Sequence, residues 1–529
     1  MTSRLLPLLT VALLLILVAL PLLFILLQAL FPALAQGSLA GAFTPIPTLL
    51  ADPQLPALLS GTLKTGLSVA LLSALVGIPL GTLRGLFHLP LARIWDLLLL
   101  IPFLTPPYIS ALSWMLALQH NGYLYQAIGL DLNDLLFSQS GITLVMTLNI
   151  FPVVYFAVSR SLLASGQQLA IVARVHGASA WRAFWHVTLP MLLPALAAGI
   201  LLAFTLAIEE YGVPAALGSR AGVVMLTVGI EERLADWPID LPGSSLLSML
   251  LVMVALAAFA LQKKLVGNKD VTSINGKPAQ NSGISLGVWR VPVLLLFCLM
   301  ALLMVVLPMS SMLLTSLLST LSGGMHLSNL TLRHFAALFA LQGDALTALS
   351  TSLGLALGAA LITGLLGFLA AWLVVVRRIR GAALIDALSL LPAALPGVVV
   401  GVGLILLWNQ PFWPVRYVSS ALKQLGSNLE PAARVHGASA WAALRHIVLP
   451  LVFPSLLAAM LMVFAIASRE LVTSLLLAPA GTQTVSVFIW RQFEQGSVGQ
   501  GMAMASIAMG TGLALMLTAL AILQRRERG

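Results

Sequence analysis

Four histidines are the residues of this 529-residue chain whose type and spacing could bind a metal ion. His176 and His186 lie ten residues apart, and His436 and His446 repeat that spacing 260 residues later. All four lie in predicted loops at equivalent positions of a repeat, which favours a docking surface over metal coordination. The single cysteine, Cys298, lies in an apolar run, so neither an intrachain disulfide nor a cysteine metal site is possible. The sequence predicts no metal site and no cofactor.

Two carboxylates and one guanidinium lie where long apolar runs end. Glu210 follows the run 190–208, and Arg469 and Glu470 follow the run 450–468. Ionisable groups at such positions are costly to bury and often mark a transport path. Glu210, Glu470 and Arg469 are therefore candidates for a gate or path. The alternative is that they lie at the membrane interface or form local ion pairs.

The chain lacks the residues that bind the phosphates of ATP. The motif Gly-x-x-x-x-Gly-Lys-Ser/Thr, whose backbone cradles phosphate groups, is absent. This chain therefore cannot hydrolyse ATP by that route. No cluster of His, Glu and Asp lies within the apolar runs, so we predict no catalytic residue and no enzymatic activity.

Composition identifies the solvent in which this chain folds. Hydrophobic residues make up 60% of it and charged residues 8%, against about 25% charged in a typical soluble domain. A lipid bilayer is therefore the expected surrounding. The net charge of +10 is spread over short loops rather than one face, which argues against a nucleic-acid partner.

Apolar runs of about 20 residues predict membrane-spanning helices. The predicted spans are approximately 5–31, 66–83, 94–117, 141–159, 190–208, 244–262, 291–316, 346–376, 384–408, 450–468 and 498–523. Prolines 102, 106 and 107 are expected to kink the third helix, and prolines 392 and 396 its counterpart.

An exact repeat relates the two parts of the chain. The nine residues 173–181 recur unchanged at 433–441, and 14 of 22 positions match between 173–194 and 433–454. Other pairs correspond at different offsets: Asp96 with Asp386 and Pro102 with Pro392 at 290, and Leu63 with Leu349 at 286. The sequence therefore predicts a duplication.

We divide the chain into a first half (1–262), a polar cytoplasmic linker (263–290) and a second half (291–529). The fold class is all-α: a polytopic membrane protein of two parallel repeats with about six helices each, nominally 12. The second half lacks about 30 residues where the fourth helix is expected. This indicates a shortened or broken helix near 409–422, or an internal deletion that impairs function.

Basic residues in short loops remain on the cytoplasmic side of a membrane. With the N-terminus inside, 21 of the 27 Lys and Arg residues fall in cytoplasmic segments. This asymmetry predicts that both termini are cytoplasmic and that both copies of the repeated loop face the cytoplasm.

The repeated loop has a readable local structure. Gly177 and Gly437 can end a helical turn in the left-handed conformation. Ser179 and Ser439 stand where an N-cap would start a second short helix. We expect that helix to end before Pro190 or Pro450, where the next membrane helix begins.

The loop resembles the cytoplasmic-loop motif of binding-protein-dependent ABC transport permeases. That motif has Gly, nine residues, a β-branched residue, any residue, and Leu-Pro, as in Gly177 to Leu189-Pro190 and Gly437 to Leu449-Pro450. Its opening Glu-Ala-Ala is replaced by Ile-Val-Ala at 171–173 and Pro-Ala-Ala at 431–433. The two-copy layout is similar to the fused permeases of ferric-iron and thiamine uptake systems and to a group of enterobacterial inner-membrane permeases.

This resemblance implies a type I ABC importer permease fold in the bacterial inner membrane. It implies a cytoplasmic ATP-binding subunit, in two copies, and a periplasmic substrate-binding protein as partners. The implied ATPase-docking residues are Ala173, Arg174, Gly177, Ala178, Ser179, Trp181, Leu189, Pro190, Ala433, Arg434, Gly437, Ala438, Ser439, Trp441, Leu449 and Pro450. The alternatives are an ion-coupled secondary transporter with two parallel repeats, and a membrane enzyme, although ionisable residues within the spans are scarce.

Overall fold

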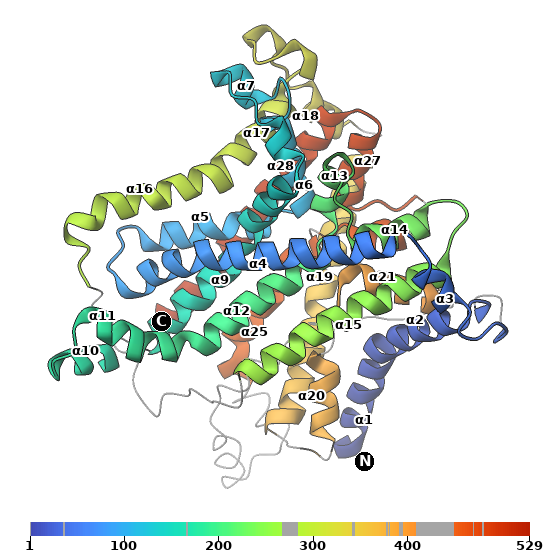
Figure 1. Ribbon diagram of the computed structural model, residues 1–529, viewed down its shortest axis with the longest axis horizontal. Helices are drawn as coiled ribbons and strands as arrows, with labels where there is room; N and C mark the ends of the chain where they lie inside the picture. The colour runs from blue at the N-terminus through green and yellow to red at the C-terminus, as the bar shows by residue number, and fades with distance from the viewer. Residues whose placement is uncertain are drawn as a thin grey trace. The chain divides into compact units, whose positions relative to one another are not determined.

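The computed structural model consists of helices joined by short connections (Figure 1). The part of the chain that it describes contains no β-strand, only two isolated bridges. The predicted all-α, polytopic architecture is confirmed. The described residues are 2–34, 38–165, 168–266, 284–340, 344–376, 379, 381–390, 395–408, 449–468, 470–478 and 481–528.

The helices have the following bounds in chain order. They are α1 Thr2–Leu14, η1 Leu15–Ala19, α2 Leu20–Leu30, α3 Pro45–Leu50, α4 Leu55–Leu86, α5 Ala92–Leu104, α6 Pro107–Leu118, α7 Tyr123–Ile128, α8 Asn133–Leu136, α9 Gln139–Ser165, α10 Gln168–Val175, α11 Ala180–Ala183, η3 Phe184–Thr188, α12 Leu189–Glu209, α13 Gly212–Ala221, α14 Leu226–Ala235 and α15 Leu241–Val266. They continue as η4 Gly287–Trp289, α16 Arg290–Ala301, η5 Leu302–Val306, α17 Leu307–Leu317, η6 Leu321–Gly323, η7 Leu327–Asn329, α18 Arg333–Leu338, α19 Asp344–Ala371, η8 Trp372–Val376, α20 Ala382–Leu390, α21 Gly397–Trp408, α25 Leu449–Ser468, α26 Val472–Leu477, α27 Val485–Glu494 and α28 Val498–Arg528.

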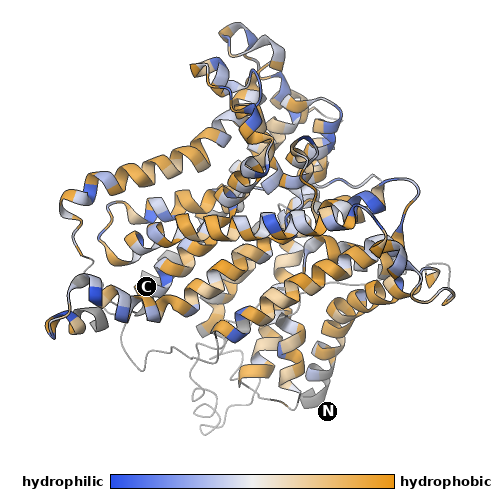
Figure 2. Cartoon of the chain, viewed as in Figure 1, coloured by the Kyte–Doolittle hydropathy of each residue, from blue (hydrophilic) through white to orange (hydrophobic). Residues whose placement is uncertain are grey.

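Seven helical stretches among the described residues are long and apolar enough to cross a membrane, and two bent helix pairs raise this number to nine. Figure 2 shows hydrophobic residues along most of the length of the long helices. The seven are Leu9–Leu30, Leu55–Leu86, Gln139–Leu163, Trp181–Glu209, Leu241–Gln262, Gly287–Leu317 and Asp344–Val375. Each contains or overlaps one of the predicted apolar runs. Length and hydropathy alone therefore predicted where these helices lie.

The described chain falls into two compact units that differ from the two sequence halves. Unit 1 contains Met1–Thr48, Asp240–Met249 and Thr315–Gly529, and unit 2 contains Leu49–Ile239 and Leu250–Leu314. The first helices of each half therefore pack among helices of the other half. The division of the duplicated sequence at 262 and 291 remains a prediction. The segment 409–422, expected to be a shortened helix, lies outside the described residues.

In unit 2, α4 and α9 run side by side (Figure 1) and pack through glycines spaced four residues apart. A Cβ added at Gly77 would lie 2.9 Å from the Cβ of Val154, and one added at Gly81 would lie 2.8 Å from the Tyr155 carbonyl oxygen. Small residues at this spacing allow two membrane helices to approach closely and gain dispersion contacts. In the same unit, Phe297 of α16 packs on Trp95 of α5, with ring centroids 5.7 Å apart.

In unit 1, two similar close approaches hold the helices together. Gly364 of α19 meets Met460 of α25, and a Cβ at Gly364 would lie 2.5 Å from the Met460 Cγ. A Cβ at Gly403 of α21 would lie 2.9 Å from the carbonyl oxygen of Pro21 in α2. The N-terminal helix thus belongs to the packed core of this unit.

Three helices pass through a proline because a π-turn precedes it. Leu20, Leu189 and Leu307 each donate their N–H to the carbonyl five residues earlier, and each is followed directly by proline. In a regular α-helix the proline ring would clash with the carbonyl four residues earlier. The wider π-turn moves this carbonyl away and keeps the chain helical.

The predicted third span, 94–117, is broken rather than kinked. Helices α5 and α6 meet at an angle of 93° across Thr105 and Pro106. The residue before a proline is pushed out of the helical region, and Thr105 is extended with ψ 133°. Consecutive prolines at 106 and 107 therefore end one helix and begin another.

Sequence reasoning missed two pairs of short helices. Helices α13 and α14 follow α12 and are bent by 93°, and α26 and α27 follow α25 in the same order. Each helix has only 6 to 10 residues, so none can span a bilayer alone. The apolar-run criterion of about 20 residues passes over such elements.

Replacing Gly81 by Ala tests the close packing of α4 on α9. We expect Gly81→Ala to lower the free energy of unfolding by about 1–3 kcal/mol, because the added methyl meets backbone of α9. Gly354→Ala is the matched control, since this glycine lies within α19 with nothing within 4 Å of its added Cβ. The control should gain about 0.5–1 kcal/mol through helix propensity. Unfolding in detergent measures both, and equal signs would contradict the packing argument.

Candidate functional site

The first copy of the repeated loop is a helical elbow between α9 and α12. Helix α10 ends at Val175, and Gly177, two residues later, has a φ of +92°. The Ala178 N–H donates to the Ala173 carbonyl, and the Gly177 N–H donates to the Arg174 carbonyl, each at 3.0 Å. These two bonds define a Schellman motif, in which a left-handed glycine satisfies the last carbonyls of a helix. The predicted left-handed helix end at Gly177 is confirmed.

A serine cap begins the next helix. The Ser179 hydroxyl accepts a hydrogen bond from the Arg182 N–H at 3.2 Å, and the Ala183 N–H donates to the Ser179 carbonyl. Both bonds are those of an N-cap residue. The predicted N-cap at Ser179 is therefore confirmed, and the chain direction between α10 and α11 is fixed on both sides of the turn.

The prediction that this second helix ends before Pro190 is wrong. Helices α11, η3 and α12 follow one another without interruption, and the backbone is right-handed helical at Ala183 and Leu189. The π-turn at Phe184–Thr188 removes the clash that Pro190 would otherwise cause. One continuous helix of 29 residues, Trp181–Glu209, therefore joins the loop to the membrane span.

The elbow exposes apolar and cationic side chains together. Val175 is 79% exposed and Trp181 is 71% exposed. The ring of Trp185 lies 5.4 Å from that of Trp181 and 5.9 Å from that of Phe184. Arg174 and Arg182 are exposed beside them. Apolar surface of this kind is costly to leave in water and typically marks an interaction surface.

The two histidines of this copy bond to backbone rather than to each other. The Nδ1 atom of His176 lies 2.9 Å from the Val172 carbonyl oxygen, and that of His186 lies 3.1 Å from the Arg182 carbonyl oxygen. Each Nδ1 therefore carries the proton and donates within its own helix. Histidine on an exposed helix surface is thereby kept in one orientation.

The second copy is described only where its membrane helix begins. Leu449 and Pro450 open α25. The other candidate residues of this copy lie outside the described residues, namely Ala433, Arg434, Gly437, Ala438, Ser439 and Trp441. Arg469 also lies outside them.

The candidate gate residues Glu210 and Glu470 occupy matching places after α12 and α25. The Glu210 carboxylate accepts from the Gly212 N–H at 2.8 Å. The Glu470 carboxylate accepts from the N–H and the hydroxyl of Thr473, both at 3.0 Å. N–H groups in the first turn of a helix lack partners within it. Each carboxylate therefore satisfies the beginning of the short helix that follows, α13 or α26.

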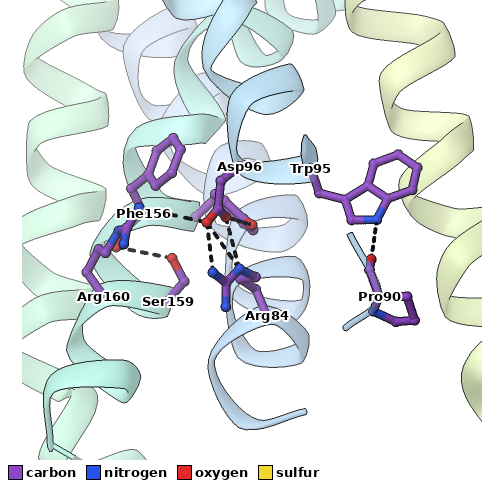
Figure 3. Close-up of polar contacts among 8 residues, drawn as sticks. Arg84, Pro90, Trp95, Asp96, Phe156, Ser159 and Arg160 are labelled. Carbon is purple, nitrogen blue, oxygen red and sulfur yellow. Dashed lines mark hydrogen bonds and ion pairs between the residues drawn. The ribbon is translucent and has the colours of Figure 1, made fainter. Parts of the chain in front are cut away.

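An ion-pair cluster that sequence reasoning missed joins the ends of α4, α5 and α9 nearest the repeated loop (Figure 3). The Arg84 guanidinium donates to both carboxylate oxygens of Asp96, at 2.9 to 3.2 Å. The Tyr155 hydroxyl donates to Asp96 at 2.7 Å. Arg160 lies 3.8 Å from the same carboxylate and over the ring of Phe156. One carboxylate thus ties α4 and α9 to α5.

The Arg84–Asp96 pair is poorly accessible to water, with side chains 14% and 13% exposed, whereas Arg160 at its edge is 62% exposed. Three hydrogen bonds from one guanidinium and one from a phenol satisfy the carboxylate, as a buried charge requires. A signal existed in the sequence, because Asp96 pairs with Asp386 by repeat and stands among basic residues. Its partners Tyr155 and Arg84 are 59 and 12 residues away, which no local pattern reveals.

Comparisons with known proteins agree with this arrangement. The sequence profile described as "Binding-protein-dependent transport system inner membrane component" matches residues 73–269 and 365–529, so each match contains one copy of the repeated loop. The ferric transport system permease protein FbpB of Actinobacillus pleuropneumoniae is 25% identical over 456 residues, which is 79% of this chain and 64% of that protein.

Two further relatives match a larger and a smaller part of the chain. A putative ferric transport system permease protein, FbpB 1, of Haemophilus influenzae is 26% identical over 418 residues, 74% of this chain and 65% of that protein. A probable sulfate transport system permease protein, cysT, of Chlorokybus atmophyticus is 30% identical over 200 residues, 37% of this chain and 68% of that protein. The chain spans slightly less than two thirds of the length of the two ferric permeases.

Substituting Asp96 tests the ion-pair cluster. We expect Asp96→Asn to lower the free energy of unfolding by about 2–3 kcal/mol, because Arg84 is left in a poorly hydrated place without its counter-charge. Tyr155→Phe removes one hydrogen bond and should cost about 1 kcal/mol. Asp134→Asn, at an exposed carboxylate in the short helix α8, is the control and should change stability by less than about 0.5 kcal/mol. If Asp96→Asn matches this control in thermal unfolding, the cluster contributes no stability.

Proposed function

We propose that this chain, which belongs to the family of inner membrane components of binding-protein-dependent transport systems, is the fused permease subunit of an ABC importer. It carries a small solute across the bacterial inner membrane. A separate cytoplasmic subunit hydrolyses the ATP, and a periplasmic binding protein delivers the solute.

The observation that supports this proposal most is the helical elbow at 168–190. The Schellman turn at Gly177 and the cap at Ser179 hold it in one shape. The exposed Trp181 and Val175 offer an apolar contact, and exposed Arg174 and Arg182 surround it with positive charge. We infer that the partner offers an apolar groove with acidic edges, and that it is the ATP-binding subunit.

Two copies of the loop call for two such sites. The residues that form the elbow, from Ala173 to Trp181, are identical at 433–441. An identical surface binds an identical partner, so we expect one ATP-binding subunit at each copy. The departure from Glu-Ala-Ala at 171–173 removes a negative charge from this surface, which weakens attraction to any basic contact and leaves the apolar contact dominant.

The continuity of Trp181–Glu209 gives the proposal its mechanism. At 1.5 Å per residue, its 29 residues form a rod about 43 Å long. A displacement of the elbow by the ATP-binding subunit therefore moves the whole of α12. The rod ends at Glu209, and the next residue, Glu210, caps α13. Motion at the docking surface thus reaches the short helices at the opposite end of α12 without a flexible joint.

The orientation follows from charge. With the repeated loops and both termini in the cytoplasm, 21 of the 27 basic residues lie on that side, as the positive-inside rule requires. The α13–α14 pair and the loop that carries Trp237 then face the periplasm, where the binding protein would dock.

Substituting Gly177 tests the docking role. We expect Gly177→Ala combined with Gly437→Ala to reduce the amount of ATP-binding subunit that co-purifies by about tenfold. An alanine at the positive φ of Gly177 costs roughly 1–2 kcal/mol and distorts the elbow, and the identical sequence around Gly437 predicts the same effect there. Gly129→Ala is the matched control, since Gly129 has a φ of +72° and nothing near its added Cβ. Unchanged co-purification and unchanged ATP-driven uptake in the double variant would refute the docking role.

Cysteine labelling tests the orientation. Cys298 is the only cysteine, so Cys298→Ser gives a background for single cysteines in place of Trp181, Trp441 or Trp237. We expect a membrane-impermeant maleimide to label positions 181 and 441 only in inverted vesicles, and position 237 only in intact spheroplasts. Labelling of 181 and 441 from opposite sides would contradict the two-loop arrangement.

A further inference from the structure

In unit 2, a hydroxyl of a long helix holds the beginning of a short one. The Leu226 N–H, the first of α14, donates to the Thr62 hydroxyl of α4 at 2.8 Å. The Thr62 hydroxyl in turn donates to the Leu58 carbonyl of its own helix. Thr62 is fully buried. Because Met225 precedes the helix and has no side-chain acceptor, the hydroxyl from α4 takes the place of an N-cap.

Unit 1 contains the same bond. The Val485 N–H, the first of α27, donates to the Ser352 hydroxyl of α19 at 2.7 Å. Ser352 is 6% exposed. Here Thr484 caps the helix through the Val487 N–H, yet the Val485 N–H still reaches across to the long helix. The two units thus make the same contact with different side chains. In each, a hydroxyl of a long helix accepts the hydrogen bond of the first N–H of a short helix.

The numbering supports an equivalence between these contacts. Thr62 and Ser352 are 290 residues apart, the offset that relates Asp96 to Asp386. The offset of 286 that pairs Leu63 with Leu349 would instead place Ser352 opposite Gly66, one helical turn away. The hydrogen bonds thus differ from the predicted pairing of Leu63 with Leu349 and relate the two long helices at an offset of 290.

Each pair of short helices is attached to two different long helices. The carboxylates of Glu210 and Glu470 begin the first short helix, and they move with α12 and α25. The hydroxyls of Thr62 and Ser352 begin the second short helix, and they belong to α4 and α19. A shift of α12 relative to α4 must therefore strain or break one of the two attachments of the α13–α14 pair.

We propose that Thr62 and Ser352 are matched positioning residues, whose hydroxyls hold α14 and α27 as gating elements on the side of the membrane opposite the repeated loops. This rests on the proposed function, in which α12 transmits the motion of the ATP-binding subunit. The hydroxyl bond favours the closed position, and release of the N–H frees the short-helix pair to move.

Close packing at Gly61 of α4 offers a second way to displace α14 in unit 2. A Cβ added at Gly61 would lie 2.0 Å from the Val224 carbonyl oxygen, so α4 touches the backbone just before α14. Gly61→Ala should push α14 away while leaving the Thr62 hydroxyl in place. This substitution therefore displaces the short helix without removing the hydroxyl.

The test uses buried reporter positions on the two short helices. Ile230 of α14 and Ile489 of α27 are both fully buried, and each is replaced by cysteine in the Cys298→Ser background. In membrane vesicles, Thr62→Val should raise maleimide labelling at position 230 by about tenfold, because the Leu226 N–H is left without its acceptor. Ser352→Ala should do the same at position 489. Gly61→Ala should raise labelling at 230, and Thr62→Ser should restore the wild-type rate.

Two threonines serve as matched controls for loss of a helix hydroxyl. Thr205 of α12 and Thr363 of α19 donate their hydroxyls to carbonyls of their own helices. Thr205→Val and Thr363→Val should leave both labelling rates unchanged. Equal increases in these controls, or wild-type labelling in Thr62→Val and Ser352→Ala, would overturn the proposal.

A functional readout separates gating from mere local stability. In vesicles containing the ATP-binding subunit, Thr62→Val should keep ATP hydrolysis while uptake falls at least about threefold, since a loosened gate uncouples the two. If both fall together, the role is structural and the proposal fails. If no ATP-binding subunit assembles with the wild-type chain, the proposed function fails, and the labelling comparison still decides whether the hydroxyls hold the short helices.

Discussion

A backbone N–H without a partner in its own helix needs another acceptor where water is scarce, and this constraint shapes the beginnings of the short helices. Where α12 gives way to α13, the Glu210 carboxylate takes over. Where α14 begins, a hydroxyl from α4 does so. Before Pro190, a π-turn preserves the helix. The short helices α13, α14, α26 and α27 persist because a side chain accepts a hydrogen bond at the beginning of each.

The sequence predicted the features that local physics determines. Apolar runs located the long spans, and the identities of Gly177 and Ser179 predicted a left-handed helix end and an N-cap, both of which the structure contains. The kink expected from Pro106 and Pro107 became a full break. Pro190 had the opposite outcome, because a π-turn depends on hydrogen-bond geometry over several residues that a single proline does not reveal.

Contacts between distant residues were the features that could not be predicted. The cluster around Asp96 and the bond from Leu226 to Thr62 join residues up to 164 positions apart. The candidate site was predictable in its loop residues, because an exact repeat marks them. The short helices were not, because their 6 to 10 residues fall below the length at which hydropathy alone identifies a membrane element.

The assignment of helices to the two units has a consequence for how such a chain can be assembled. Unit 1 takes residues 1–48 from the start of the chain, and unit 2 takes Leu250–Leu314 from around the linker and beyond. If a gene encoding this protein were split within the linker, neither product could complete its own core. The two polypeptides would have to intertwine while folding and would form an obligate heterodimer, stable only in each other's presence. Fusion into one chain guarantees equal amounts of both and keeps each exchanged helix within reach of its destination.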